Sequence, residues 1–138
     1  MRVLLDTNVV LDFILKRSPF NIEAKEIFVR AAQRQIKIFV SPITPINAFY
    51  TTRKEKGKDV AFQSIEKLLK IVQITKSDKY ILQNALLLNF NDYEDAVQHE
   101  CALAENLDAI VTRNTKDYKN SSVKVYSPAE FIQLLQTT

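Results

Sequence analysis

Short apolar runs alternate with longer stretches of helical spacing along the whole chain. The runs at 3–5, 36–40 and 109–111 are rich in valine, isoleucine and leucine, and weaker runs follow at 72–74 and 123–125. Runs of this length and composition predict five strands. The residues Val3-Leu4-Leu5 do not alternate between apolar and polar, which is typical of a strand covered on both faces.

Between these runs, apolar residues recur three and four positions apart, as they do on one face of a helix. The spacing predicts helices over about 7–15, 21–33, 46–57, 62–69, 78–88 and 92–106, and from 128 onward. Gly57 is expected to end the third helix, and Pro128 to open the last, because proline favours the first turn. Alternating strands and helices predict an α/β fold, a three-layer α/β/α sandwich around a central parallel sheet of about five strands.

Length and composition fit a single domain that covers residues 1–138. The chain has 138 residues, of which 46% are hydrophobic and 25% charged, as in ordinary soluble proteins. No apolar run approaches the roughly 18 residues that a membrane span needs. The N-terminal stretch becomes acidic at Asp6, too early for a signal peptide, so we expect a cytoplasmic protein that has no membrane partner.

Three of the residue types that occur only once restrict the possible kinds of site. Cys101 is the only cysteine, which excludes an internal disulfide and a cysteine-based zinc site. His99 is the only histidine, so any metal is expected to have oxygen ligands, which suits Mg²⁺ or Mn²⁺. Gly57 is the only glycine, so the glycine-rich loops that bind ATP, GTP or NAD are missing and no nucleotide cofactor is expected.

Acidic and amide side chains gather at one edge of the predicted sheet. In a parallel sheet, sites lie beyond the carboxyl ends of the strands. Asp6 ends the first strand, and residues 112–117 follow the fourth strand at the same edge. The helix at 92–106 runs antiparallel to that fourth strand, so its N-terminus returns to this edge, where the helix carrying Asn47 also starts. The residues expected there are Asp6, Asn8, Asn47, Asp92, Asp95, Asn114 and Asp117.

This set of oxygen-bearing side chains predicts metal-assisted chemistry. Clustered carboxylates raise one another's pKa, and a divalent cation relieves the repulsion between them. One or two such ions deprotonate a water molecule and stabilise the transition state of phosphodiester cleavage. Residue inventory and topology therefore favour phosphodiester hydrolysis that needs neither histidine nor cysteine.

Several of these residues also have a purely structural interpretation. Asp6 and Asp92 are suited to cap the helices that follow them, and Asp117 is suited to close a turn. Asp12 lies within the first helix, where we expect it at the surface or in a supporting role. His99 falls in the middle of a helix, which favours a structural role over a catalytic one.

Four stretches of the chain follow one another at the spacing of a known set of motifs. Residues 4–9 read LLDTNV and residues 41–47 read SPITPIN. Further on, residues 92–96 read DYEDA, and residues 108–114 read DAIVTRN, followed by KDY at 116–118. Together they span nearly the whole chain and resemble the four motifs of the PIN-domain family, in particular bacterial PIN proteins such as toxins of the VapC type.

The resemblance implies a ribonuclease that depends on Mg²⁺ or Mn²⁺, acts on RNA, is commonly a homodimer and, in the VapC type, pairs with an antitoxin protein. By position, Asp6 is the first metal ligand and Asp95 the second, while Asp117 supplies a further catalytic acid. The supporting residues that the resemblance implies are Asn8, Asn47, Asp92, Thr112 and Asn114.

Two positions depart from the family pattern. The second motif usually offers a glutamate where this chain has Asn47, and the fourth often offers an acid where it has Asn114. An asparagine carbonyl can coordinate a hard cation but brings no charge. We therefore expect one bound metal rather than two. Two functions stay open, an active ribonuclease and a weak or inactive PIN module that binds RNA or a protein partner.

Two unrelated functions fit the same layout less well. The loop at 6–10 weakly resembles the nucleophile loop of haloacid dehalogenase phosphatases, but Asn8 replaces the second acid of that loop. A phospho-receiver domain needs a phospho-accepting aspartate after the third strand, and residues 73–76 contain none. The nuclease interpretation therefore ranks above both.

Overall fold

The strands form one parallel sheet with the first strand at its centre. The computed structural model describes residues 1–137, and its sheet has the order β3-β2-β1-β4-β5, with every neighbouring pair parallel. The strands are β1 (Arg2–Leu5), β2 (Lys37–Val40), β3 (Gln73–Ile74), β4 (Ala109–Val111) and β5 (Lys124–Tyr126). The predicted parallel sheet of about five strands is confirmed, with strand ends that move by a residue or two.

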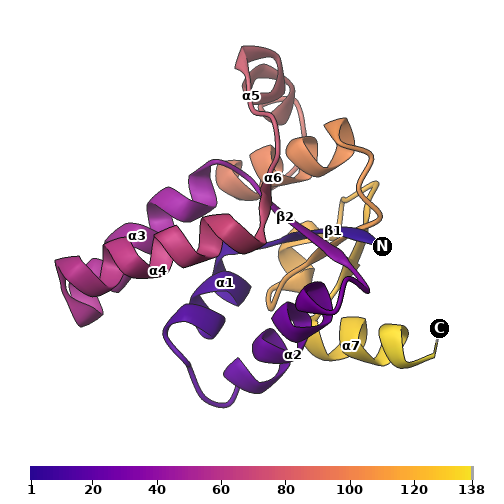
Figure 1. Ribbon diagram of the computed structural model, residues 1–138. Helices are drawn as coiled ribbons and strands as arrows, with labels where there is room; N and C mark the ends of the chain where they lie inside the picture. The colour runs from indigo at the N-terminus through magenta and orange to yellow at the C-terminus, as the bar shows by residue number, and fades with distance from the viewer. Residues whose placement is uncertain (138) are drawn as a thin grey trace.

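Helices cover both faces of this sheet, so the predicted three-layer fold is also confirmed (Figure 1). The helices are α1 (Thr7–Ile14), α2 (Asn21–Ala32), α3 (Ile43–Lys56), α4 (Lys58–Ile71), α5 (Lys79–Ala85), α6 (Tyr93–Ala104) and α7 (Pro128–Gln136). A short 3₁₀ helix, η1 (Thr115–Tyr118), which the spacing does not predict, follows β4. The structure starts α3 three residues earlier than predicted, at Ile43.

Side chains of β1 alternate between two apolar clusters on opposite faces of the sheet. Val3 and Leu5 pack with α1, α2 and α7, whereas Leu4 packs with residues of α6 and η1. All three side chains are fully buried. Burying each one contributes about 1.5–3 kcal/mol to folding. Both layers therefore fix the position of β1, and with it the carboxyl end of the strand, where Asp6 follows.

Gly57 ends α3 and directly precedes α4, as the sequence predicts for the end of that helix. Its φ of 92° lies in the left-handed region that glycine adopts without strain. The N–H of Gly57 donates to the carbonyl of Arg53, which closes the last turn of α3. The two helices extend side by side away from the sheet, at the left of Figure 1.

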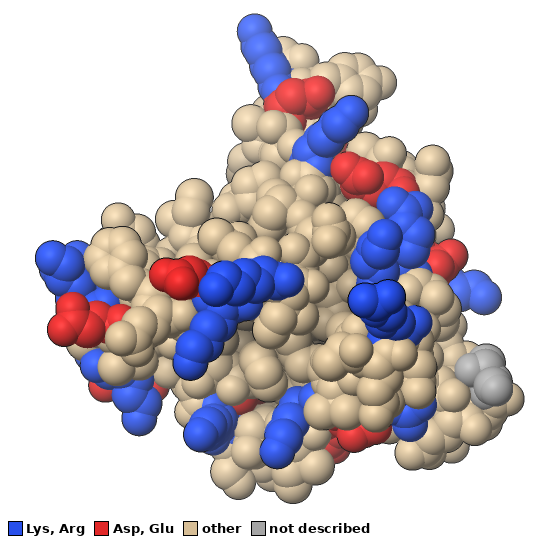
Figure 2. Space-filling view, in the orientation of Figure 1, with Lys and Arg blue, Asp and Glu red and all other residues tan. Residues whose placement is uncertain are grey.

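Lysine and arginine side chains are spread over the face shown in Figure 2, with acidic side chains between them. This distribution fits the modest formal net charge of +3. Among residues 1–137, no helix combines the length and apolar character that crossing a bilayer requires.

Candidate active site

An open hollow of about 350 Å³ lies where the carboxyl ends of β1 and β4 meet the start of α6. The strands β1 and β4 are neighbours in the sheet, so the residues that follow them emerge side by side. The hollow is lined by Asp6, Asn8, Asn91, Asp92, Glu94, Asp95, Asn114 and Asp117. Six of the seven residues that the sequence places at this edge therefore share one concave surface. Asn47 is the exception.

Asp6 is buried at the base of this hollow and is held by three hydrogen-bond donors. Its Oδ1 accepts from the Thr7 N–H at 2.7 Å and from Gln98 Nε2 at 2.9 Å. Its Oδ2 accepts from the Thr112 hydroxyl at 2.8 Å. The side chain thus caps α1, as its structural interpretation predicts, and its orientation is fixed from three directions. Because each carboxylate oxygen accepts about two hydrogen bonds, Oδ2 keeps room for one more partner.

Gln98 and Tyr118 complete the surroundings of Asp6, and neither is among the site residues predicted from the sequence. Gln98 is fully buried on α6; its Nε2 donates to Asp6 and also to the Tyr118 hydroxyl at 3.1 Å. The Tyr118 hydroxyl in turn donates to Asp95 Oδ1 at 3.2 Å. A signal was present, since Gln98 is an uncharged polar residue three positions after Asp95, on the side of the helix that faces the sheet.

Asp95 is the most strongly perturbed acid that lines the hollow. Burial raises its pKa to about 7, and the charges of Asp6 and Asp92 add to the increase, while the hydrogen bond from Tyr118 opposes it. The charge of Asp117 also contributes. Asp95 therefore carries a proton for part of the time near neutral pH, which shows that protein cations do not compensate the negative charge here.

Asn47 and Glu94 form a pair beside the hollow. Asn47 Nδ2 donates to Glu94 Oε1 at 3.0 Å, so the asparagine reaches the acidic hollow only through that glutamate. Burial, together with the charges of Asp6 and Asp92, raises the pKa of Glu94. Glu94 thus brings an acid to the hollow from α6, close to the position on α3 where the family pattern places one.

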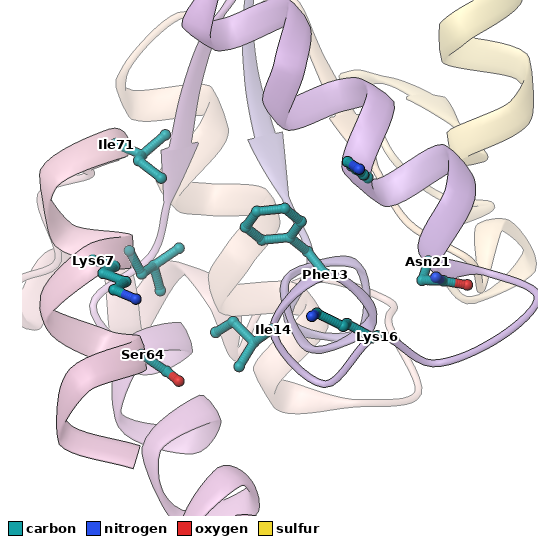
Figure 3. Close-up of a pocket in the computed structure, with 9 residues that line it drawn as sticks. Phe13, Ile14, Lys16, Asn21, Ser64, Lys67 and Ile71 are labelled. Atoms are coloured by element: carbon teal, nitrogen blue, oxygen red, sulfur yellow. The ribbon is translucent and has the colours of Figure 1, made fainter. Parts of the chain in front are cut away.

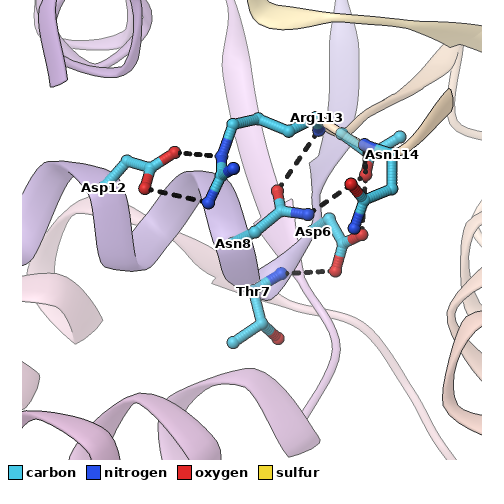
Figure 4. Close-up of polar contacts among 7 residues, drawn as sticks. Asp6, Thr7, Asn8, Asp12, Arg113 and Asn114 are labelled. Atoms are coloured by element: carbon cyan, nitrogen blue, oxygen red, sulfur yellow. Dashed lines mark hydrogen bonds and ion pairs between the residues drawn. The ribbon is translucent and has the colours of Figure 1, made fainter. Parts of the chain in front are cut away.

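Asn8, Thr112 and Asn114 connect α1 to the loop after β4 (Figure 4). The Thr112 hydroxyl donates to Asp6 and accepts from the Asn114 N–H at 3.0 Å and from Asn8 Nδ2 at 3.4 Å. Asn8 Oδ1 accepts from the N–H of Arg113 at 3.3 Å. These contacts hold the loop against the carboxylate that ends β1.

Asp12 supports the same loop from below. Of the two roles expected for it, the surface one is wrong, because its side chain is 1% exposed. Arg113 donates to both carboxylate oxygens, from Nε at 2.7 Å and from an Nη at 3.3 Å (Figure 4). Burial raises the pKa of Asp12, and the hydrogen bond and charge of Arg113 oppose that rise. His99 and its bond from the Ser122 N–H fit the predicted structural role.

The side chains of the hollow suit a hard divalent cation, although they do not form a ready-made cage. Each of these side chains ends in a carboxylate or an amide group, whose oxygen can coordinate such an ion. Within residues 1–137, no three acidic, imidazole or thiol side chains stand together at metal-binding geometry. An ion bound at Asp6 Oδ2 would therefore attract the Asp95 and Asp117 side chains or complete its shell with amide oxygens and water.

A family model described as a PIN domain matches residues 2–116. The chain belongs to the PIN-domain family. The match covers all of β1 to β4 and the helix α6, and so every residue that lines the hollow except Asp117. The comparison with curated proteins by sequence found no match.

Solved structures of similar fold include a toxin–antitoxin complex and a toxin. VapBC2 from Rickettsia felis, bound to promoter DNA, matches with a TM-score of 0.67 and 20% identity over 92% of this chain and 98% of that one. A toxin–antitoxin complex from Klebsiella pneumoniae matches with a TM-score of 0.69 and 24% identity, over 91% of this chain and 97% of that one. VapC20 from Mycobacterium tuberculosis is a toxin that cleaves the sarcin–ricin loop. It matches with a TM-score of 0.64 and 11% identity, over 78% of this chain and 86% of that one. These likenesses establish the PIN fold.

The raised pKa of Asp95 leads to a prediction for the stability of this PIN protein without metal. Because the folded-state pKa lies above the ordinary value of 3.8, the protonated side chain favours folding below about pH 4, and this contribution is lost as the pH rises through about 7. In the presence of a chelator, we expect the free energy of unfolding to fall by about 1–2 kcal/mol between pH 5 and pH 8; water at the half-buried group limits the change.

Denaturant unfolding at several pH values checks this prediction. Asp95→Asn should remove most of the fall, because the amide does not titrate. Asp59→Asn, at an exposed position in the first turn of α4, should preserve it. A wild-type profile that stays flat from pH 5 to 8 would show that Asp95 is already ionised at low pH.

Proposed function

We propose that this PIN protein is a metal-dependent endoribonuclease that hydrolyses RNA phosphodiester bonds and acts as the toxin of a toxin–antitoxin pair. The observation that carries the proposal is the shared hollow, in which the anchored Asp6 lies with Asp95 and Asp117. Excess negative charge at a concave site disfavours RNA by itself, and a divalent cation reverses that sign.

Asp6 and Asp95 are the proposed ligands of Mg²⁺ or Mn²⁺. When bound, such an ion neutralises phosphate charge and lowers the pKa of a water molecule. Three donors fix the Asp6 carboxylate, and the Tyr118 hydroxyl orients Asp95. Asp117 is the further acid of the proposed catalytic set, and it lines the same hollow as Asp6 and Asp95.

The supporting residues are proposed to act by positioning. Asn8 and Thr112 hold the loop after β4 against Asp6, and the loop carries Asn114 into the hollow. Asp92 caps α6 through the N–H of Asp95, which fixes the first turn of that helix. Asn47 and Asn114 bring no charge, so we retain the proposal of one metal rather than two.

An antitoxin is the proposed protein partner. The K. pneumoniae structure, whose fold this chain shares, is a toxin–antitoxin complex. A second hollow lies between α1, α2 and α4 (Figure 3). Its apolar lining includes Phe13 and Leu68, and three lysines also line it, Lys16, Lys25 and Lys67. Such a surface suits an amphipathic acidic segment, which is the kind of peptide that we expect a cytoplasmic antitoxin to supply.

A homodimer is proposed from the apolar surface of the α3–α4 hairpin. Ile46, Tyr50 and Phe62 are each more than half exposed and line one hollow along the two helices. Exposed apolar clusters of this kind are typical of protein interfaces. Sedimentation of the purified protein would test the dimer independently of its activity.

The second candidate function is that of a PIN module that binds RNA or a protein without hydrolysing RNA. The observation that favours it is the lack, within residues 1–137, of three acids already at metal-binding geometry. Together with the uncharged Asn47 and Asn114, this leaves fewer carboxylates than an efficient metal nuclease uses. Metal-dependent cleavage distinguishes the two functions.

Metal removal is the direct test of the proposed activity. Purified protein incubated with single-stranded and hairpin RNA should cleave in Mn²⁺ or Mg²⁺, and excess chelator should abolish cleavage because the remaining carboxylates repel the phosphates. Adding back Mn²⁺ should restore it. Cleavage that persists in chelator would reveal a contaminating or metal-independent nuclease, and intact RNA under every condition would favour the binding module.

A further inference from the structure

A stacked pair of side chains stands next to the acidic hollow and has no part in the proposed hydrolysis. Phe20 directly precedes α2 and is 44% exposed. The guanidinium carbon of Arg113 lies 4.1 Å from the centre of its ring, within the range of a cation–π contact. Part of the Phe20 ring is therefore open to solvent beside a guanidinium that lies over its face.

The stack is preorganised by a buried anion. Arg113 makes two hydrogen bonds to Asp12, whose side chain is 1% exposed, so the guanidinium plane cannot turn freely. Its positive charge is already matched by that carboxylate. A phosphate would therefore gain little from Arg113, whereas a flat, weakly polar ring gains from stacking on Phe20 and Arg113 at small entropic cost.

The pair forms one wall of an open pocket of about 490 Å³. The pocket is lined by Pro19, Phe20, Glu23, Arg113, Ser127, Pro128 and Ala129. Its two prolines and the ring of Phe20 are apolar and rigid, so they form walls that suit a planar group. Glu23 adds a carboxylate, which repels phosphate and accepts hydrogen bonds from an amino group.

The pocket adjoins the acidic hollow along the backbone. Arg113 lines the pocket, and the next residue, Asn114, lines the hollow. The N–H of Arg113 also donates to Asn8 Oδ1, and Asn8 lines the hollow. Arg113 and Asn114 are consecutive residues, so the wall of the pocket continues directly into the wall of the hollow. A strand with a phosphate in the hollow can therefore place a neighbouring base in the pocket.

We propose that the Phe20–Arg113 pocket binds one unpaired nucleobase of the RNA, next to the phosphate held in the acidic hollow. The base stacks on the Phe20–Arg113 pair, and Glu23 accepts a hydrogen bond from its exocyclic amino group, which selects the amino-bearing bases adenine, cytosine and guanine over uracil. This inference rests on the proposed function for its choice of ligand, and it makes Phe20 and Glu23 specificity-determining residues.

Binding measured without catalysis tests the pocket separately from the nuclease activity. Fluorescence anisotropy with short fluorescein-labelled RNA that carries non-hydrolysable linkages, in Mn²⁺ and low salt, reports affinity without cleavage. Phe20→Ala should weaken binding about 5- to 150-fold, since stacking one base contributes about 1–3 kcal/mol. Tyr80→Ala, the same substitution at an aromatic residue that is 69% exposed on α5, should leave affinity within twofold.

A double-mutant cycle then identifies the ligand as a base. A set of RNAs carries one abasic nucleotide, each at a different position. The wild-type protein should bind one of them more weakly than the intact RNA, and Phe20→Ala should bind that RNA and the intact RNA equally well. Glu23→Gln should reduce the preference for the amino-bearing bases over uracil at the same position. Phe20→Leu, which keeps apolar bulk but loses the ring, provides the comparison should the alanine variant unfold.

The outcomes separate the two proposals. Additive penalties in the cycle, or unchanged RNA affinity in both Phe20 variants, would overturn the base pocket even where the wild-type protein cleaves RNA. Coupled penalties in a protein that never cleaves would retain the pocket and reject the nuclease.

Discussion

Replacing Asp6 with asparagine should lower RNA cleavage about a thousandfold or more. The substitution removes the one carboxylate that three donors fix at the base of the acidic hollow. Stabilisation of transition-state charge by a metal ion is worth several kcal/mol, and about 1.4 kcal/mol corresponds to a tenfold change in rate. The amide also brings an N–H₂ group to a place where every neighbour is a donor, so at least one of these hydrogen bonds is lost.

The measurement is single-turnover cleavage of one labelled RNA in Mn²⁺, with wild type, Asp6→Asn and Asp59→Asn. Asp59 is exposed in the first turn of α4 and lines none of the hollows described above, so its amide variant should cleave like wild type. Calorimetric titration with Mn²⁺ should show weaker binding to Asp6→Asn alone. Full cleavage by Asp6→Asn would remove the basis for the proposed active site.

Replacing Gln98 with glutamate should cost about 10- to 100-fold in cleavage and in Mn²⁺ affinity, the usual range for a residue that orients a ligand. The glutamine donates to Asp6 Oδ1 at 2.9 Å from a fully buried position. A glutamate of the same shape puts an acceptor where Asp6 needs a donor. Two buried carboxylates at that distance cannot both be ionised, so one of them takes up a proton near neutral pH.

The loss in Gln98→Glu should depend on pH in a way that a merely misfolded variant would not. Protonation of the new carboxyl restores a donor, so the ratio of variant to wild-type Mn²⁺ affinity should rise as the pH falls. Gln63→Glu makes the same change at an exposed position of α4 and should match wild type throughout. A constant ratio between pH 5 and 8 would indicate that Gln98 only fills space.

Much of the fold can be predicted from the sequence because the core elements are strongly patterned. Val3-Leu4-Leu5 is too short and too apolar to be anything but a buried strand in this context, and Gly57 is the one residue free to adopt a φ of 92°. Strand ends and the short helix η1 were less predictable, since hydrogen bonds to neighbouring segments set them. Leu86 and Leu87, for example, lie outside α5 although their spacing is helical.

The sequence by itself determined the family motifs, the order of strands and helices, and the edge of the sheet at which Asp6, Asp95 and Asp117 lie. Local residue order is enough for this, because in a parallel sheet each strand delivers its carboxyl end to the same edge. Only the tertiary structure decided which side chains hold Asp6 in place. Gln98 lies 92 positions from Asp6 along the chain and Thr112 lies 106, and such contacts leave no periodic trace in the sequence. The same holds for Asp12, which is buried because Arg113, from another element, supplies the charge and the donors that make its burial tolerable.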